Sequence, residues 1–191
     1  MTGTQRREQL LDVAKGIIDR EGVAAVSIES VARGAGITRP IVYDHFDGLD
    51  DLLTRTLQRE AARALSQLTP HLPGADVAPR EALLHAFRAY LEAVAADPAT
   101  WRLVLLPPQG VPAVLRELVT QGREAIVATL AATAGAGFSP DRPSPDPALT
   151  ARSLSALADE AARLLLTDPE TYPVDRLLAH GAWLIDQVTG S

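Results

Sequence analysis

Apolar residues recur at the spacing of an α-helix along most of the 191-residue chain, and no stretch of useful length alternates as a half-buried β-strand would. A first apolar face lies near the N-terminus, where the recurring positions are Leu10, Leu11, Ala14, Ile17 and Ile18. A longer stripe of leucine and alanine runs from residue 49 to residue 68. The pattern therefore predicts an all-α fold.

Capping residues, glycines and prolines divide this pattern into about nine helices. Ser27 is a suitable N-cap for a second helix, which the glycines of residues 34–36 would end. Thr38 is placed to cap a short third helix, with Pro40 in its first turn, where a missing N–H costs little. The long fourth helix is followed by five more, which are expected at residues 80–96, 99–106, 113–134, 147–167 and 173–188.

Residues 27–53 have the layout of a helix-turn-helix DNA reader, with a helix, a tight glycine turn, a short second helix and the start of a long one. From Thr38 to His45 the short helix would be roughly 12 Å long, which suits a major groove about 12 Å wide. Thr38 and Arg39 are placed to reach a phosphate and a base edge, since arginine can bind guanine through two hydrogen bonds. Tyr43 and His45 can pack with their rings while their polar tips reach backbone oxygens.

The net charge of −6 argues against DNA binding through overall charge. Residues 1–60 are not basic either, because they hold eight Lys and Arg against ten Asp and Glu, a balance of −2. A DNA-reading surface would therefore need its positive charge gathered on one face of the domain.

Residues 6–55 resemble the DNA-binding domain of the tetracycline-repressor-like (TetR) family of regulators. The resemblance combines residue types with spacing, and its features are the Leu10–Ile18 helix, Glu21-Gly22, Ser27-Ile28, Val31-Ala32, Ala35-Gly36-Ile37, Tyr43-x-His45-Phe46 and Leu52-Leu53. The chain length and the number of predicted helices also fit the family, whereas the C-terminal two thirds match only in helix count. The resemblance implies a three-helix DNA-binding domain, residues 1–48, joined by a long helix to a ligand-binding and dimerisation domain, residues 49–191.

Carried over position by position, the resemblance implies DNA contacts by ten residues. Arg6 and Arg7 fall in the family's N-terminal arm. The sequence-reading positions are occupied by Arg39, Pro40 and Ile41. The remaining five residues are Ser27, Arg33, Thr38, Tyr43 and His45.

One position departs from the family pattern. The family usually carries a phosphate-binding lysine at the start of the fourth helix, where this chain has Leu49. The flanking residues are acidic, namely Asp47, Asp50 and Asp51. With one phosphate contact missing and three acids nearby, we expect weaker non-specific DNA binding and a shallower dependence of affinity on salt.

In the C-terminal domain the resemblance implies a pocket for a small molecule, with mostly apolar walls and few polar groups. The candidates to line it are Phe87, Tyr90, Trp101 and Gln109. Phe87 and Tyr90 also stand at core spacing, so ordinary packing is an alternative for them. His85 and Arg102 could join the lining but are more typical of the surface.

Small residues on the last two predicted helices permit close helix approach, and the family dimerises through these helices. They are Ala151, Ala158, Ala161, Ala162, Gly181 and Ala182. Packing within one chain is the alternative interpretation. A twofold dimer would place two reading heads one turn of DNA apart, about 34–36 Å.

Enzymatic function is not expected. The chain has no cysteine, which excludes disulfides, thiolate zinc sites and cysteine nucleophiles. Its four histidines lack metal-ligand spacing, and no serine stands in a nucleophile elbow or a phosphate loop, so no metal or cofactor is predicted. Asp159-Glu160 are interpreted as solvated acids. In the absence of a signal-peptide or membrane-span pattern, a cytoplasmic protein is the expectation.

These observations lead to the hypothesis of a ligand-responsive transcriptional regulator. It would be a repressor that binds a palindromic operator in double-stranded DNA as a homodimer and is released by a small, largely apolar effector. The alternative is a helical small-molecule carrier or interaction protein that has lost operator binding, which Leu49 and the −2 balance of residues 1–60 favour.

Overall fold

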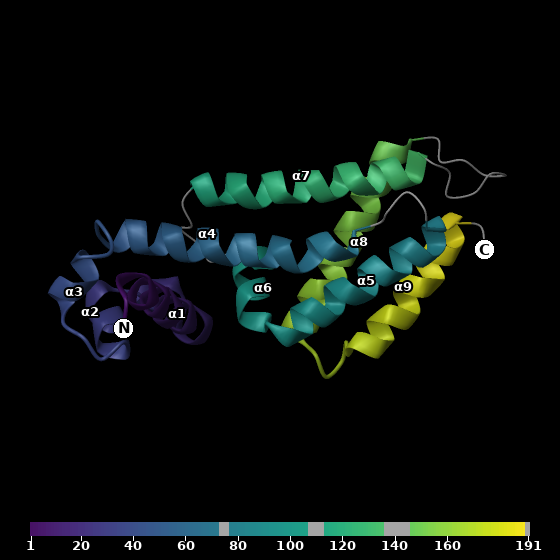
Figure 1. Cartoon of the computed structure of the whole chain (residues 1–191). Coiled ribbons are helices and arrows are strands. Elements are labelled where there is room, and N and C mark those ends of the chain that lie inside the picture. The colour runs from purple at the N-terminus through teal and green to yellow at the C-terminus, as the bar shows by residue number, and fades with distance from the viewer. Residues whose placement is uncertain (73–76, 107–112, 136–145, 190–191) are drawn as a thin grey trace. The chain divides into compact units, whose positions relative to one another are not determined.

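The computed structural model describes residues 1–72, 77–106, 113–135 and 146–189 (Figure 1). No strand occurs in these residues, so the predicted all-α fold is confirmed. The helices are α1 (Gly3–Glu21), α2 (Ile28–Gly34), α3 (Arg39–Tyr43), α4 (Leu49–Leu68), α5 (Pro79–Ala96), α6 (Pro98–Leu105), α7 (Ala113–Gly135), α8 (Pro147–Thr167) and α9 (Val174–Thr189). Gln109, a candidate pocket residue, lies outside the described residues. None of the helices in the described segments is both long and apolar enough to span a membrane.

The chain divides into two compact units that are not continuous in sequence. Unit 1 comprises Met1–Arg63 and Ala99–Leu118, and unit 2 comprises Ala64–Pro98 and Val119–Ser191. Nearly all of α6 therefore packs with the N-terminal helices, although it follows α5 in the chain. These units do not coincide with the boundary expected after residue 48 between a DNA-binding and a ligand-binding domain, and that functional boundary stays a prediction.

Helix α1 begins earlier than its apolar face indicates. Thr2 is its N-cap: the hydroxyl of Thr2 accepts a hydrogen bond from the Gln5 backbone at 3.2 Å, and the Gln5 side chain accepts one from the Thr2 backbone at 2.8 Å. Arg6 and Arg7 therefore lie within the helix, and the expectation of an N-terminal arm at these residues is wrong. This capping box satisfies backbone donors at the helix start and so extends helical structure through polar residues.

The turn between α2 and α3 follows from local chemistry. Ser27 and Ser30 cap α2 reciprocally, with backbone-to-side-chain hydrogen bonds of 2.8 and 2.9 Å. Gly36 then adopts φ +67°, the left-handed region that favours glycine, and the chain reverses into α3. Thr38 occupies the N-cap position of α3 without a capping side-chain hydrogen bond, and the helix is shorter than expected, ending at Tyr43.

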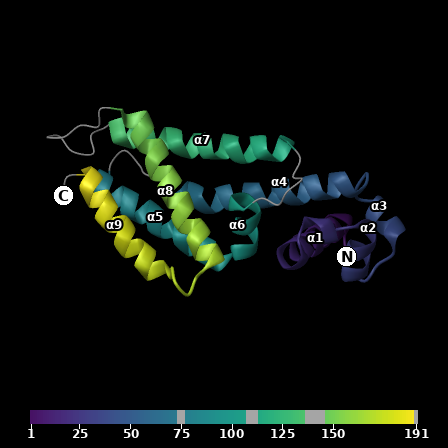
Figure 2. The ribbon, with the colours of Figure 1, turned by 180° about the vertical axis from the view of Figure 1, so that it is seen from behind.

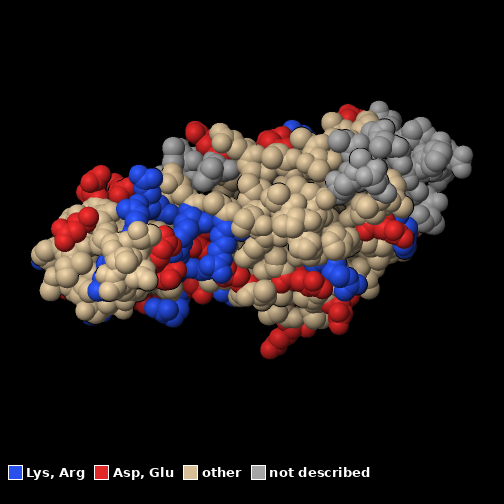
Figure 3. Space-filling view, viewed as in Figure 1, with Lys and Arg blue, Asp and Glu red and all other residues tan. Residues whose placement is uncertain are grey.

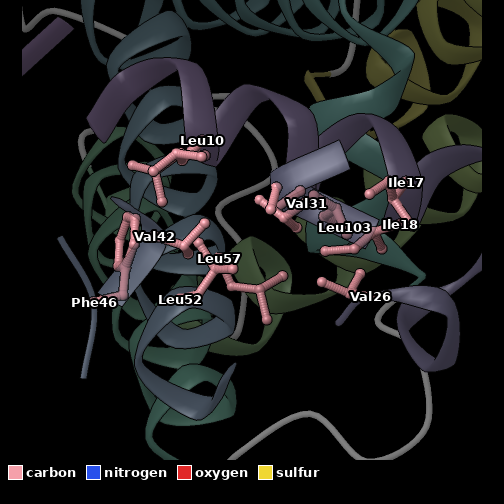
Figure 4. Packing of buried hydrophobic residues seen from close by; sticks show 13 residues of the cluster. Leu10, Ile17, Ile18, Val26, Val31, Val42, Phe46, Leu52, Leu57 and Leu103 are labelled. Carbon is pink, nitrogen blue, oxygen red and sulfur yellow. The ribbon is translucent and has the colours of Figure 1, made fainter. Parts of the chain in front are cut away.

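Unit 1 is organised around one apolar core (Figure 4). Its labelled members are Leu10, Ile17, Ile18, Val26, Val31, Val42, Phe46, Leu52, Leu57 and Leu103. Val42 of α3 and Phe46 just beyond it are 0% and 2% exposed, and burying a side chain of this kind stabilises a fold by roughly 1.5–3 kcal/mol. Because these two side chains point into the core, the residues on the opposite side of α3 face solvent.

A buried charge cluster ties α6 to α1 and α4 within unit 1. Glu60 of α4 is fully buried, and its carboxylate lies 2.9 Å from Lys15 Nζ and 2.7 Å from Arg59 Nη2. Thr100 of α6 accepts a hydrogen bond from Lys15 at 2.6 Å and donates one to Glu60 at 2.5 Å. Three helices thus share one polar centre in which the buried carboxylate is compensated.

Unit 2 packs α5 against α8 and α9 (Figure 2). Its apolar cluster is built from Leu83, Val127, Leu130, Ala151 and Ile185. A Cβ atom at Gly181 would lie 2.1 Å from Phe87 Cε1, so a larger residue on α9 at this position would force the Phe87 ring of α5 to move. Ala162 is likewise fully buried, so some of the small residues considered for dimerisation serve packing within one chain.

Candidate functional site

Helix α3 presents an exposed face on the side opposite its buried anchors. The predicted DNA-contact residues on this helix and its N-cap are all exposed, namely Thr38, Arg39, Pro40, Ile41 and Tyr43. Tyr43 is 58% exposed, which is unusual for an aromatic side chain beside a core. Arg33 on α2 and Ser27 at its N-cap are also exposed, and α2 packs against α3. The structure therefore brings seven of the ten predicted residues to solvent on two packed helices.

Arg7 holds the end of α3 in place. Its guanidinium donates a hydrogen bond of 2.7 Å to the His45 carbonyl and lies 4.6 Å from the centre of the Phe46 ring. Arg6 bonds to Gln9 within α1 at 2.5 Å, and His45 itself is half-buried. These side chains have structural partners within unit 1, and their contacts to DNA stay predictions.

The acidic residues at the start of α4 have different roles. Asp51 pairs with Arg55 at 3.1 Å and accepts a hydrogen bond from the Asp47 backbone at 3.3 Å, so it serves the N-terminus of the helix. Asp50 is exposed, and Leu49 is half-buried against the core of unit 1. The position of the family lysine is therefore used for packing in this chain.

Positive and negative side chains are interspersed over unit 1 on the face that Figure 3 shows. Arg59 pairs with Glu8 at 2.9 Å and with Asp12 at 2.8 Å, and Arg102 pairs with Asp19 at 2.8 Å. The charges of Arg59 and Arg102 are thus engaged by acids of the same unit. A DNA surface here depends on particular side chains at α2 and α3 rather than on a broad basic field.

The interior of unit 2 contains a polar centre that joins α5, α7 and α8. The Tyr90 hydroxyl donates a hydrogen bond of 2.8 Å to Asp159 Oδ1, and the Arg123 guanidinium forms an ion pair with Asp159 Oδ2. Tyr90 and Asp159 are each 8% exposed. Burial, the charge of Asp159 and the hydrogen bond to it raise the pKa of Tyr90 well above its ordinary value, so the phenol remains a neutral donor.

The aromatic candidates for a ligand pocket fall in both units. Phe87 and Tyr90 lie one turn apart on α5, and Phe87 packs against the apolar cluster of unit 2. Trp101 is buried on α6 in unit 1, at 2% exposure. His85 is exposed, with its Nε2 3.1 Å from His71 Nδ1. Ligand contact by the candidate residues stays a prediction.

Asp159 is the functional candidate that sequence reasoning missed, since the interpretation of this acid as solvated is wrong. A signal was present in the helical spacing. Asp159 lies four and eight residues after Ser155 and Ala151 and three and seven residues before Ala162 and Leu166, all of which are buried. These intervals place it on the inward face of α8, where a charged side chain needs a partner.

Comparison with known proteins assigns both parts of the chain. Residues 10–56 match the family model described as bacterial regulatory proteins, tetR family. Residues 79–190 match the model described as tetracyclin repressor-like, C-terminal domain. The second match alone spans more than half of the chain, and the first includes α2, α3 and most of the exposed face described above.

Individual relatives agree with these matches. An uncharacterised HTH-type transcriptional regulator of Mycobacterium tuberculosis H37Rv is 30% identical over 139 residues, which cover 71% of this chain and 64% of that protein. A TetR-like regulator structure from Rhodococcus sp. RHA1 has a TM-score of 0.78 at 22% identity, with 97% of each chain covered. A putative regulator from Saccharomonospora viridis, in complex with choline, has a TM-score of 0.77 at 23% identity, with 96% of each covered. The structural likenesses show a shared fold, and the chain spans less than two thirds of the curated relative.

Proposed function

The chain belongs to the TetR family of bacterial regulatory proteins, and on this premise we propose that it is a DNA-binding transcriptional regulator that responds to a small molecule. The observation that carries the proposal is the exposed face of α3, raised on the buried Val42 and Phe46 and preceded by the tight turn at Gly36. A short helix held by its apolar side leaves its other side for the major groove.

The proposed contacts follow from the positions of the side chains. Arg39 lies in the first turn of α3, where a guanidinium can bind a guanine edge through two hydrogen bonds. Tyr43 lies at the other end of the helix, and its exposed phenol suits a phosphate oxygen. Arg33 and Ser27 on α2 would add backbone contacts that set the register of the protein on the duplex.

We propose further that the regulator works as a homodimer formed through α8 and α9, as the family does. Large apolar side chains are exposed on both helices: Leu149 at 61%, Leu157 at 50% and Trp183 at 55%. A second copy of the chain packed against α8 and α9 would cover these side chains. A dimer of this kind reads a palindrome, and repression with release by a largely apolar effector is the proposed mode of action.

The proposed partners are double-stranded DNA and a small-molecule effector. A related solved structure holds choline, which supports a small molecule as the type of ligand that such a helical domain accepts. Because the protein would act where chromosomal DNA lies, we propose a cytoplasmic location. We also propose that it has no catalytic role.

A fluorescence anisotropy titration tests DNA binding directly. Labelled duplexes covering the region upstream of the protein's own gene are titrated at several salt concentrations, with a scrambled duplex of equal length as control. We expect one duplex to bind with nanomolar affinity and the scrambled control to bind at least about a thousandfold more weakly. Equal binding of all duplexes would refute operator recognition and leave the helical carrier as the better description.

Variants at α3 distinguish reading from positioning. Tyr43→Ala should weaken binding to all sequences by a similar factor, as the loss of a phosphate contact does. Arg39→Ala should instead relax the preference at one base pair, at a cost of about 1–3 kcal/mol for the preferred sequence. Unchanged affinity of Tyr43→Ala would show that this assignment is wrong.

The carrier alternative is favoured by one observation, which is the packed Leu49 beside exposed acids. Leu49→Lys tests its weight, since the aliphatic stem can keep part of the packing while the ammonium reaches a phosphate. We expect tighter DNA binding and a salt dependence steeper by about one unit of slope. A slope identical to that of the parent protein would contradict the idea that a phosphate contact is missing here.

A further inference from the structure

Asp159 is a buried acid whose neutralising cation is accessible to solvent. Its side chain is 12% exposed, whereas the side chain of its ion-pair partner Arg123 is 41% exposed. The other carboxylate oxygen is held by Tyr90, which is buried and comes from a different helix. One oxygen therefore has a fixed partner, and the other has a partner that can turn outward.

This arrangement selects for positive charge. An uncompensated carboxylate in a protein interior costs several kcal/mol, so the ionised form of Asp159 is stabilised by a cation beside Oδ2. Tyr90 cannot replace it, because a neutral phenol supplies a hydrogen bond but no charge. The guanidinium of Arg123 stands on a long side chain that is 41% exposed, so it can turn into solvent when another cation takes its place. An anionic molecule at the same place would leave two negative charges together.

Apolar side chains lie within about one and a half helical turns of the polar centre on each of the three helices. On α5, Phe87 precedes Tyr90 by three residues; on α7, Val127 follows Arg123 by four. On α8, Leu154 precedes Asp159 by five residues. All three apolar residues belong to the hydrophobic cluster of unit 2 or pack against it. The polar centre thus lies at one end of an apolar cluster, the arrangement that suits a molecule with a charged head and an apolar body.

We propose that Asp159 and Tyr90 form the head-group site for an effector that is an apolar organic ammonium. Its ammonium replaces Arg123 at Asp159 Oδ2, and its apolar part packs beside Phe87 and the neighbouring cluster. This inference rests on the proposed function as an effector-responsive regulator and adds the chemical class of the effector. Because Arg123 lies on α7 and Asp159 on α8, the exchange also removes an ion pair between these helices, which gives ligand binding a structural consequence.

Isothermal titration of the full chain, without DNA, tests the charge requirement. The probes are decylammonium, decanoate and decanol, which share one apolar chain and differ in head-group charge. We expect decylammonium to bind and the other two to bind at least about thirtyfold more weakly, the factor expected for a buried charge pair. Equal binding of decanol or decanoate, or no binding of decylammonium, would overturn the proposal.

Two variants identify the residue responsible. Asp159→Asn should weaken decylammonium binding by about thirtyfold or more. The matched control is Glu124→Gln. It breaks another ion pair between α7 and α8, the one between Glu124 and Arg152, which is 2.7 Å long and has both side chains exposed. This control should bind decylammonium like the parent. Equal affinities of Asp159→Asn and the control would overturn the assignment.

The variant Arg123→Gln tests the proposed site even if Asp159→Asn does not fold. Arg123→Gln removes the competing cation but keeps the carboxylate, so decylammonium should bind about tenfold more tightly, and its binding should raise the melting temperature more than in the parent. A purely structural ion pair predicts loss of stability with no gain in affinity, and that result would overturn the proposal.

The outcomes also separate this inference from the proposed function. Specific duplex binding combined with indifference to decylammonium refutes the ammonium site and leaves the regulator standing. Charge-dependent binding of decylammonium through Asp159, without preference for any duplex, supports the site and refutes the regulator in favour of the carrier.

Discussion

Glu60 in unit 1 and Asp159 in unit 2 are both buried carboxylates that join three helices, but their partners differ in kind. Glu60 has two cations within 3 Å, Lys15 at 2.9 Å and Arg59 at 2.7 Å, together with the Thr100 hydroxyl. Lys15 is only 14% exposed. One oxygen of Asp159 is held by the neutral hydroxyl of Tyr90, and the other pairs with Arg123, whose side chain is 41% exposed.

The difference separates a structural centre from a recognition site. Arg59 is itself held by Glu8 and Asp12, so the network around Glu60 is closed and none of its members can leave without breaking another contact. The centre around Asp159 is open at Arg123, and an incoming cation can take its place. The exposure of the partner cation thus distinguishes the two buried acids, at 14% for Lys15 and 41% for Arg123.

Removing the carboxylate of the closed centre should have the largest effect. Glu60→Ala leaves Lys15 and Arg59 without their shared counter-ion and should lower the free energy of unfolding by about 3–5 kcal/mol. Urea denaturation followed by circular dichroism measures it. The exposed ion pair Glu124–Arg152 supplies the control, Glu124→Ala, for which we expect no measurable change. A loss for Glu60→Ala as small as that of the control would break the distinction.

Asp159→Asn should have a smaller effect on stability. The amide keeps an acceptor for Tyr90, and Arg123 can turn into solvent, so we expect a loss of about 1–3 kcal/mol by the same urea assay. A loss equal to that of Glu60→Ala would mean that Asp159 is as closed as Glu60 and would weaken the case for an exchangeable cation.

The dependence of stability on acidic pH tests the closed centre through the pKa of Glu60. Burial alone would raise the pKa of Glu60, but hydrogen bonds from Thr100, Lys15 and Arg59 outweigh it and hold the pKa below the ordinary value of 4.5. A lowered pKa stabilises the fold above the ordinary value, and this contribution is lost as the pH falls through the folded value. The stability difference between the parent and Glu60→Gln, measured in urea, should therefore be constant near neutral pH and shrink below 4.5. A difference that grows with acid would contradict the sign.

The smallest expected effect is spectroscopic and concerns the fixed partner of Asp159. Because the pKa of Tyr90 is raised well above its ordinary 10.0, folded protein binds this proton more tightly than the unfolded chain, and stability falls as the pH rises above that value. In an ultraviolet titration, Tyr90 should ionise only with alkaline unfolding, because its phenol is buried and bonded to Asp159. Tyr90→Phe should therefore lower the amplitude of the phase that accompanies unfolding; an unchanged amplitude of that phase would show that the phenol is not held by Asp159.

Signals between neighbouring residues were enough to predict α2, α3 and the turn between them. The capping residue Ser27, the left-handed glycine at Gly36 and the helical spacing of apolar residues predicted these elements, because each of these signals acts over a few neighbouring residues. Thr38 stands at the N-cap position of α3 but makes no capping side-chain hydrogen bond. The same kind of signal, the capping box of Thr2, was overlooked at the start of α1. The predicted DNA-contact residues on α3 are exposed as that role requires.

Long-range packing decided the rest. The sequence by itself determined an all-α protein with a helix-turn-helix and the TetR pattern, since periodicity and capping are properties of neighbouring residues. Only the tertiary structure joined α6 to the N-terminal helices through Thr100 and Leu103, and only it surrounded Asp159 with Tyr90 and Arg123 from two other helices. The identity of the partner of a buried charge depends on helices that are far apart in the sequence. The spacing within one helix can show that a charged residue faces inward, but it cannot show which residue it will meet there.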